Sequence, residues 1–133
     1  MQDIAFHTVR KISATQLASL FTRSGINRRT ENGELMRNMV DTADLLVTAW
    51  DGEMLVGAAR SLTDFCAACY LADLAVDRAY QRRGIGAALV ERTRTVIGLD
   101  PILLLLAAPS AMDYYPKIGF SAVENGWIIR KPQ

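Results

Sequence analysis

Two periods of hydrophobic and polar residues divide the chain into expected strands and helices. Apolar residues that alternate with polar ones predict strands, and apolar residues three or four positions apart predict one face of a helix. The expected strands are residues 4–9, 45–50, 54–62, 67–76, 102–107, 120–123 and 127–130. The expected helices are one after the capping box at residues 13–16, one through the apolar positions of 35–40, one over 85–96, and a short one over 111–118 that Pro116 interrupts.

Turn residues between these elements indicate how they connect. Asp51-Gly52 and Asn125-Gly126 are typical of tight hairpins. Residues 102–107 are apolar at every position, which is typical of a central strand covered on both faces and parallel to the strand before the helix. The order of elements predicts one domain over residues 1–133, an α/β (α+β) fold with a mixed, mainly antiparallel sheet of about seven strands and about four helices.

Capping residues, glycines and a proline mark the expected helix ends. The first helix is expected to end at Gly25, and the second to be capped by Thr30 or Asn32. Gly98 and Pro101 are expected to end the helix that begins near Ile85.

Composition changes this picture little but excludes several classes of partner. The chain has 133 residues, half of them hydrophobic, with 15 Lys and Arg against 14 Asp and Glu. A nearly neutral chain has no strong field for nucleic acid or a membrane surface, so we expect neither as a partner. Met1-Gln2-Asp3 does not resemble the start of a signal peptide, and the apolar stretch 101–109 is too short to span a bilayer, so we expect a cytoplasmic location.

Cysteine and histidine are too few and too scattered for metal chemistry. Cys66 and Cys69 form a single pair, and His7 lies far away in sequence. A structural zinc site needs four ligands, so we expect no metal and interpret both cysteines as small buried residues.

The candidate chemistry gathers where the strand at 67–76 runs into a helix through Gln81-Arg82-Arg83-Gly84-Ile85-Gly86. A helix N-terminus carries unpaired N–H groups and partial positive charge, which attract phosphate. The two glycines leave room for an anion and the two arginines add charge, so the segment predicts a pyrophosphate site. The alternative is that the glycines permit close packing and the arginines are only solvated.

Two other phosphate motifs fit this segment poorly. A Walker loop would require a lysine after the second glycine, where Ala87 stands, and a dinucleotide fingerprint would require a third glycine at Leu89.

The same segment resembles the Gln/Arg-x-x-Gly-x-Gly/Ala pyrophosphate arm of the GCN5-related N-acetyltransferases. Tyr115-Pro116-Lys117-Ile118-Gly119-Phe120 resembles a second recurrent piece of that superfamily, Tyr-x-x-x-Gly-Phe. The order of elements is similar to the family's fold along essentially the whole chain.

The resemblance implies that acetyl-CoA, the acetyl donor, lies between the strands at 67–76 and 102–107 where these separate. The Val76 N–H would face the thioester oxygen. The family often has an asparagine at the position of Ala108, and Ser110 is a weak substitute for it. The implied cofactor-binding residues are Leu74, Ala75, Val76, Gln81, Arg82, Arg83, Gly84, Ile85, Gly86, Ala87 and Ser110.

The resemblance also implies catalytic roles. Tyr115 matches the family's general acid, with packing against Ile118 or Phe120 as the alternative. The family's glutamate falls on Tyr70, so Asp73 is the candidate base acting through water.

The acceptor side depends on analogy with the same family. Arg28 and Arg29 would bind an acidic group of the acceptor or form a solvated loop, and Asp64 would hold the amine by charge. Trp50 and Trp127 are expected to anchor the sheet. The final hairpin is often an interface in the family, so Trp127 alternatively contributes to a homodimer surface.

The sequence therefore predicts direct acetyl transfer, with no covalent enzyme intermediate, to the primary amine of a small molecule such as an aryl-alkylamine or amino sugar. The alternatives are a catalytically silent acetyl-CoA-binding regulatory module, an enzyme that acetylates a protein amine, and a binder of another phosphorylated cofactor.

Overall fold

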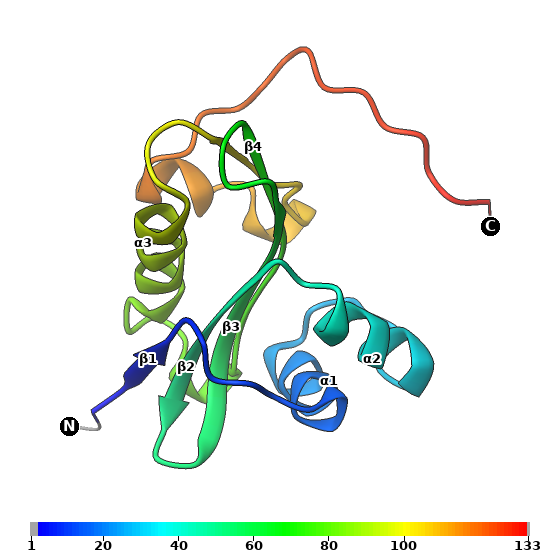
Figure 1. Ribbon diagram of the computed structural model, residues 1–133, viewed down its shortest axis with the longest axis vertical. Coiled ribbons are helices and arrows are strands. Elements are labelled where there is room, and N and C mark those ends of the chain that lie inside the picture. Colours follow the sequence, from blue (N-terminus) through cyan, green and yellow to red (C-terminus); the bar gives the residue numbers. More distant parts are fainter. Residues whose placement is uncertain (1–2, 133) are drawn as a thin grey trace.

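A twisted mixed sheet with helices on both faces forms the body of the protein (Figure 1). The computed structural model describes residues 3–132. Its strands are β1 (Ala5–His7), β2 (Leu45–Asp51), β3 (Met54–Thr63), β4 (Ala68–Val76) and β5 (Ile102–Leu104), and its α-helices are α1 (Ala14–Ser24), α2 (Gly33–Asp41) and α3 (Ile85–Ile97). Single 3-10 turns are η1 (Arg78–Tyr80), η2 (Pro109–Ala111) and η3 (Tyr115–Ile118).

The strands lie in sequence order across the sheet, β1 to β5. β1 to β4 pair antiparallel with their neighbours, although α1 and α2 lie between β1 and β2 in the sequence, and β5 pairs with β4 in parallel after the α3 crossover. The predicted mixed, mainly antiparallel pairing and the parallel strand after the helix are both confirmed.

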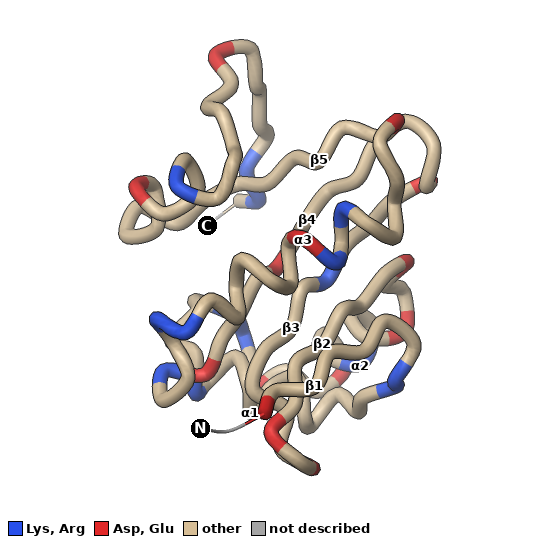
Figure 2. Tube along the Cα trace, turned by 90° about the vertical axis from the view of Figure 1, so that its left-hand side faces the viewer, with Lys and Arg blue, Asp and Glu red and all other residues tan. Residues whose placement is uncertain are grey.

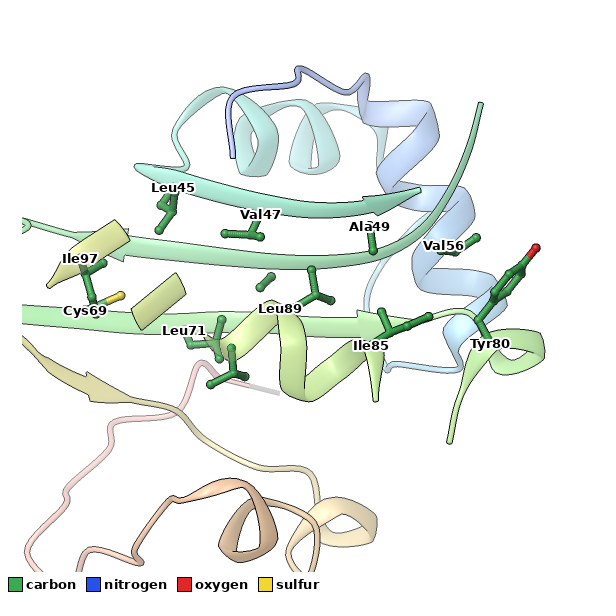
Figure 3. Close-up of a cluster of buried hydrophobic side chains, with 12 residues drawn as sticks. Leu45, Val47, Ala49, Val56, Cys69, Leu71, Tyr80, Ile85, Leu89 and Ile97 are labelled. Carbon is green, nitrogen blue, oxygen red and sulfur yellow. The ribbon is translucent and has the colours of Figure 1, made fainter. Parts of the chain in front are cut away.

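Two apolar clusters hold the helices to opposite faces of this sheet. α3 packs through Ile85 and Leu89 on one face, against Val47, Ala49 and Leu71 (Figure 3). The second cluster joins α1 and α2 to the other face, and its buried members include Leu17, Leu20, Phe21, Met36, Trp50 and Leu55. Neighbouring residues of a strand point to opposite faces of the sheet, as the period of two predicts.

Local signals at the helix and hairpin ends are confirmed. Ser13 caps α1 in a complete capping box, and Gly25 ends that helix with φ of 81°. Asn32, rather than Thr30, caps α2 by accepting a hydrogen bond from the Leu35 N–H. Gly52 supplies the positive φ of the β2–β3 turn.

The sheet is smaller than the sequence predicts. Within residues 3–132 it has five strands, and three α-helices are present, instead of seven and four. The short helix expected over 111–118 forms as the separate turns η2 and η3, because Pro116 has no N–H for a continuous helix. The expectation that 102–107 is a central strand is wrong, since β5 is the last strand of the sheet and Ile102 is 64% exposed.

The expected C-terminal hairpin does not form. Residues 121–132 are all exposed and lie away from the sheet (Figure 1). Neither Asn125 nor Gly126 adopts the positive φ that a tight turn of this kind requires. Trp127 is therefore 97% exposed and does not anchor the described sheet, whereas Trp50 is buried and its indole N–H donates to the Thr48 hydroxyl.

The two cysteines differ in their environments. Cys69 is buried in the α3-side cluster, as predicted, but Cys66 is exposed in the β3–β4 turn. Among the described residues, no group of His, Cys, Asp and Glu side chains could hold a metal ion, and no helix is long and apolar enough to cross a bilayer.

Gly57 on β3 allows α3 to approach the sheet closely. A Cβ atom there would lie 3.1 Å from Leu89 Cδ1 and 3.2 Å from Ile85 Cγ2. We expect Gly57→Val to destabilise the protein by about 1–3 kcal/mol through overpacking. Thermal unfolding measures the loss. The control is Gly33→Ala, whose added carbon meets nothing within 4 Å and should leave Tm unchanged or slightly raised. Equal Tm values for Gly57→Val and the wild type would contradict this account of the helix-sheet packing.

Candidate functional site

The central feature of the site is the separation of β4 from β5. Parallel pairing between them covers only Ala68 to Tyr70 of β4, where Tyr70 lies opposite Leu104. From there β4 continues to Val76, paired on its other side with β3. Figure 2 shows β5 turning away from β4 beyond this point. The edge of β4 from Leu71 to Val76 is thus not paired with β5, which is the separation of strands that the family resemblance implies.

A β-bulge at Ala72 lies where the strands part. Arg60 lies opposite Asp73 and Ser61 opposite Leu71, so Ala72 is an extra residue in β4. A bulge bends its strand and increases the local twist. The Ala72 carbonyl accepts a hydrogen bond from Arg28 of the α1–α2 loop, at 3.3 Å.

The opening continues into a pocket of about 1050 Å³. β4, the α1–α2 loop, the start of α3, the segment after β5 and the turns η2 and η3 all contribute to its walls. Predicted cofactor residues that line it are Leu74, Ala75, Val76, Gln81, Arg82, Gly84, Ile85, Gly86, Ala87 and Ser110. The structure therefore brings together every predicted cofactor residue except Arg83, whose guanidinium lies over the Tyr80 ring instead.

The start of α3 presents backbone N–H groups to this pocket. Gly84 precedes the helix in the left-handed conformation, with φ of 79°, and no side chain caps the helix. The first N–H groups of α3 have no acceptor within the helix. A Cβ atom on Gly86 would lie 2.6 Å from the Tyr114 hydroxyl, so the glycine lets this hydroxyl lie against the start of α3. The arrangement suits an anion such as a pyrophosphate.

A buried ion-pair cluster fixes the opposite wall. The Asp73 carboxylate accepts from Arg28 Nε at 2.6 Å and from Arg60 Nε at 2.5 Å. Asp73 is 3% exposed and does not line the pocket, whereas Arg28 does. Two guanidinium groups therefore hold this carboxylate, and one of them, that of Arg28, reaches the pocket.

Two adjacent tyrosines line the pocket near Arg28. The rings of Tyr114 and Tyr115 meet edge to face at 5.2 Å, and Tyr115 packs in the same way against Phe120 at 5.5 Å. Burial, and next the neighbouring Tyr114, raise the pKa of Tyr115, while the charge of Arg28 acts in the opposite direction. Tyr115 thus combines the packing role and the pocket position that the sequence left as alternatives.

Two residues predicted at the acceptor side lie outside the pocket. Arg29 is exposed and is not among the lining residues. Asp64 accepts backbone hydrogen bonds from Cys66, Ala67 and Ala68, which hold the pKa of its carboxyl well below the ordinary range. Asp64 thereby organises the β3–β4 turn.

The role of Arg60 is not evident from sequence motifs. The sequence offered one signal for this role, which is an arginine inside the apolar run of β3. A buried guanidinium requires a carboxylate partner. Its partner lies on the neighbouring strand, and pairing across strands depends on the register.

Comparison with known proteins identifies relatives over most of the chain. The family model described as an acetyltransferase (GNAT) domain matches residues 13–127. A probable acetyltransferase from methicillin-resistant Staphylococcus aureus superposes with a TM-score of 0.82 at 21% identity, covering 97% of this chain and 100% of that one. A soil-metagenome aminoglycoside acetyltransferase, solved with trehalose, superposes with a TM-score of 0.71 at 20% identity, covering 98% and 96%. Both likenesses show the shared fold.

Curated relatives match a shorter part of the chain. A histone acetyltransferase from Glycine max is 34% identical over 74 residues, which are 54% of this chain and 32% of that protein. A chloroplastic GCN5-related N-acetyltransferase from Arabidopsis thaliana is 35% identical over 74 residues, 54% of this chain and 29% of that protein. The chain thus spans about a third of the length of the curated relatives it matches.

Proposed function

The chain belongs to the GNAT acetyltransferase family, and we propose that it transfers an acetyl group from acetyl-CoA directly to the primary amine of a small molecule. The observation that carries this proposal is the opening between β4 and β5, with the uncapped start of α3 on its wall. One strand edge and one helix N-terminus meet there, so the pocket offers backbone donors both to an extended amide chain and to a pyrophosphate.

The residues of the pocket suit the two ends of acetyl-CoA. The edge of β4 at Leu74 to Val76, which β5 leaves unpaired, would pair with the pantetheine arm as an added strand does; the Val76 carbonyl on this edge already accepts a hydrogen bond from Gln81 Nε2 at 2.9 Å. The N–H groups from Gln81 to Ala87 would hold the pyrophosphate, with Arg82 adding charge. Ser110 lines the pocket where the family's asparagine contact is lost at Ala108.

Acetyl-CoA supplies a thioester whose carbonyl carbon the amine attacks. The Val76 N–H is proposed to donate to the carbonyl oxygen, where negative charge develops during attack; a fixed donor of this kind contributes about 3 kcal/mol to barrier reduction. Tyr115 would give its proton to the departing sulfur, and the proton that the attacking nitrogen still carries would pass through solvent to the Tyr115 oxygen, which restores the hydroxyl. Because burial raises the pKa of Tyr115 above its ordinary 10.0, the hydroxyl retains that proton at neutral pH.

The acceptor must enter as a free amine. Within the described part of the chain the pocket is lined by no carboxylate, and Asp73 is bound by two arginines. We therefore propose that the acceptor's ammonium group loses a proton to solvent before the attack. We propose that Asp73 acts as a positioning residue for Arg28.

The remaining features of the proposal concern the cellular setting. We propose a cytoplasmic enzyme that binds neither nucleic acid nor membrane, in keeping with the net charge of +1 and the two signs of charge distributed along the trace (Figure 2). We also propose a homodimer.

Tyr115→Phe tests the proposed chemistry. The variant keeps the ring packing on Phe120 but has no proton for the leaving thiolate, so we expect kcat to fall tenfold or more while the Kd for acetyl-CoA is unchanged. Release of CoA measures turnover, and calorimetric titration measures Kd. The matched control is Tyr114→Phe, which removes the adjacent hydroxyl and should lower kcat by less.

Wild-type turnover in Tyr115→Phe would contradict the assignment of Tyr115. A silent regulatory module would bind acetyl-CoA with no turnover in any of the three proteins.

A further inference from the structure

We propose that Arg28 binds an anionic group of the acceptor, so that the substrate is an amine that also carries a carboxylate or a similar anion. This inference rests on the proposed function, because it concerns the acceptor side of the same pocket. It narrows the acceptor to a chemical class that excludes polyamines and other polycations.

The charge of the pocket wall is the first support. Among its described lining residues only Arg28 and Arg82 are charged. Arg82 belongs to the loop before α3, whereas Arg28 comes from the α1–α2 loop on the other side of β4. A substrate on the Arg28 side therefore meets a cation and no compensating carboxylate on the pocket wall.

The Asp73 cluster leaves that cation only partly neutralised. Arg28 and Arg60 share one carboxylate, so the cluster keeps a net positive charge. Arg60 is buried beneath the wall, but the Arg28 side chain is 33% exposed. The excess charge therefore faces the pocket through Arg28.

The guanidinium of Arg28 is also held in a fixed orientation. Nε donates to Asp73, and the terminal nitrogens donate to the carbonyls of Asn27 at 2.8 Å and Ala72 at 3.3 Å. Each terminal nitrogen keeps a second N–H, which suits a planar carboxylate. A preoriented donor pair loses little side-chain entropy when it binds a ligand.

Arg28 and Tyr115 line the same pocket, in which we place the reacting atoms of the proposed transfer. The charge of Arg28 acts on the Tyr115 hydroxyl, which we assign as the proton donor to sulfur. An acceptor whose anion is held by Arg28 would thus present its amine to the thioester. In such an acceptor the amine lies a few bonds from the anion, as in an amino acid. A second ammonium group in place of the anion would be repelled.

Matched acceptors test this subsite. CoA release is measured with phenylalanine against phenethylamine, which differ in the carboxylate, and with spermidine as a polycation. We expect kcat/KM for phenylalanine to exceed that for phenethylamine at least tenfold, and the ratio to fall close to one in Arg28→Gln through a higher KM. Arg28→Lys keeps the charge and should restore part of the preference. Arg37→Gln, an exposed arginine on α2, is the control and should keep the wild-type ratio.

Binding without turnover gives the second readout. N-acetylphenylalanine and N-acetylphenethylamine are titrated into the CoA-saturated protein, and only the carboxylated compound should bind measurably. Equal binding of the two, no binding of either, or better use of phenethylamine or spermidine would overturn the Arg28 subsite and leave the acetyl-CoA proposal standing. Failure to bind CoA at all would instead overturn the proposed function.

Discussion

The buried carboxylate of Asp73 joins the parts of the molecule that make the site. It holds Arg60 within the sheet and Arg28 from the α1–α2 loop, and Arg28 also binds the carbonyl of the bulged residue Ala72. Loss of one partner from a buried pair costs about 3–5 kcal/mol, because an uncompensated charge remains. One ionic cluster thereby fastens the helical layer to β4 at the point where β4 leaves β5.

The opening exists because regular pairing stops there. The extra residue in β4 changes the register, and parallel pairing with β5 ends at Tyr70. Gly57 lets α3 lie close to the other face, which brings the uncapped start of that helix to the end of β4. A free strand edge and a helix N-terminus then face one pocket, and both offer backbone donors whose positions depend on packing rather than on flexible side chains.

Much of this arrangement could be predicted from the sequence, because its signals are local. The capping box at Ser13, the turn at Gly52 and the glycine-bearing start of α3 each depend on a few neighbouring residues. The ion pairs of Asp73 depend on cross-strand register and on a distant loop, and no local pattern encodes them. Asn125-Gly126 carries a hairpin signal, but residues 121–132 are exposed and form no strand, so the local signal alone does not produce a hairpin.

The central claim is that the opening between β4 and β5 binds acetyl-CoA, and thermal unfolding with separate additions of acetyl-CoA, CoA, NADH and ATP tests it most directly. A ligand at about a hundred times its Kd stabilises the folded state by about 2.7 kcal/mol, which raises Tm by several degrees. We expect that rise with acetyl-CoA and CoA alone, and its loss in Gly86→Val, whose Cβ atom would lie 2.6 Å from the Tyr114 hydroxyl and displace this side chain within the pocket. An unchanged Tm with both acetyl-CoA and CoA, or a larger rise in Tm with NADH or ATP, would contradict the account.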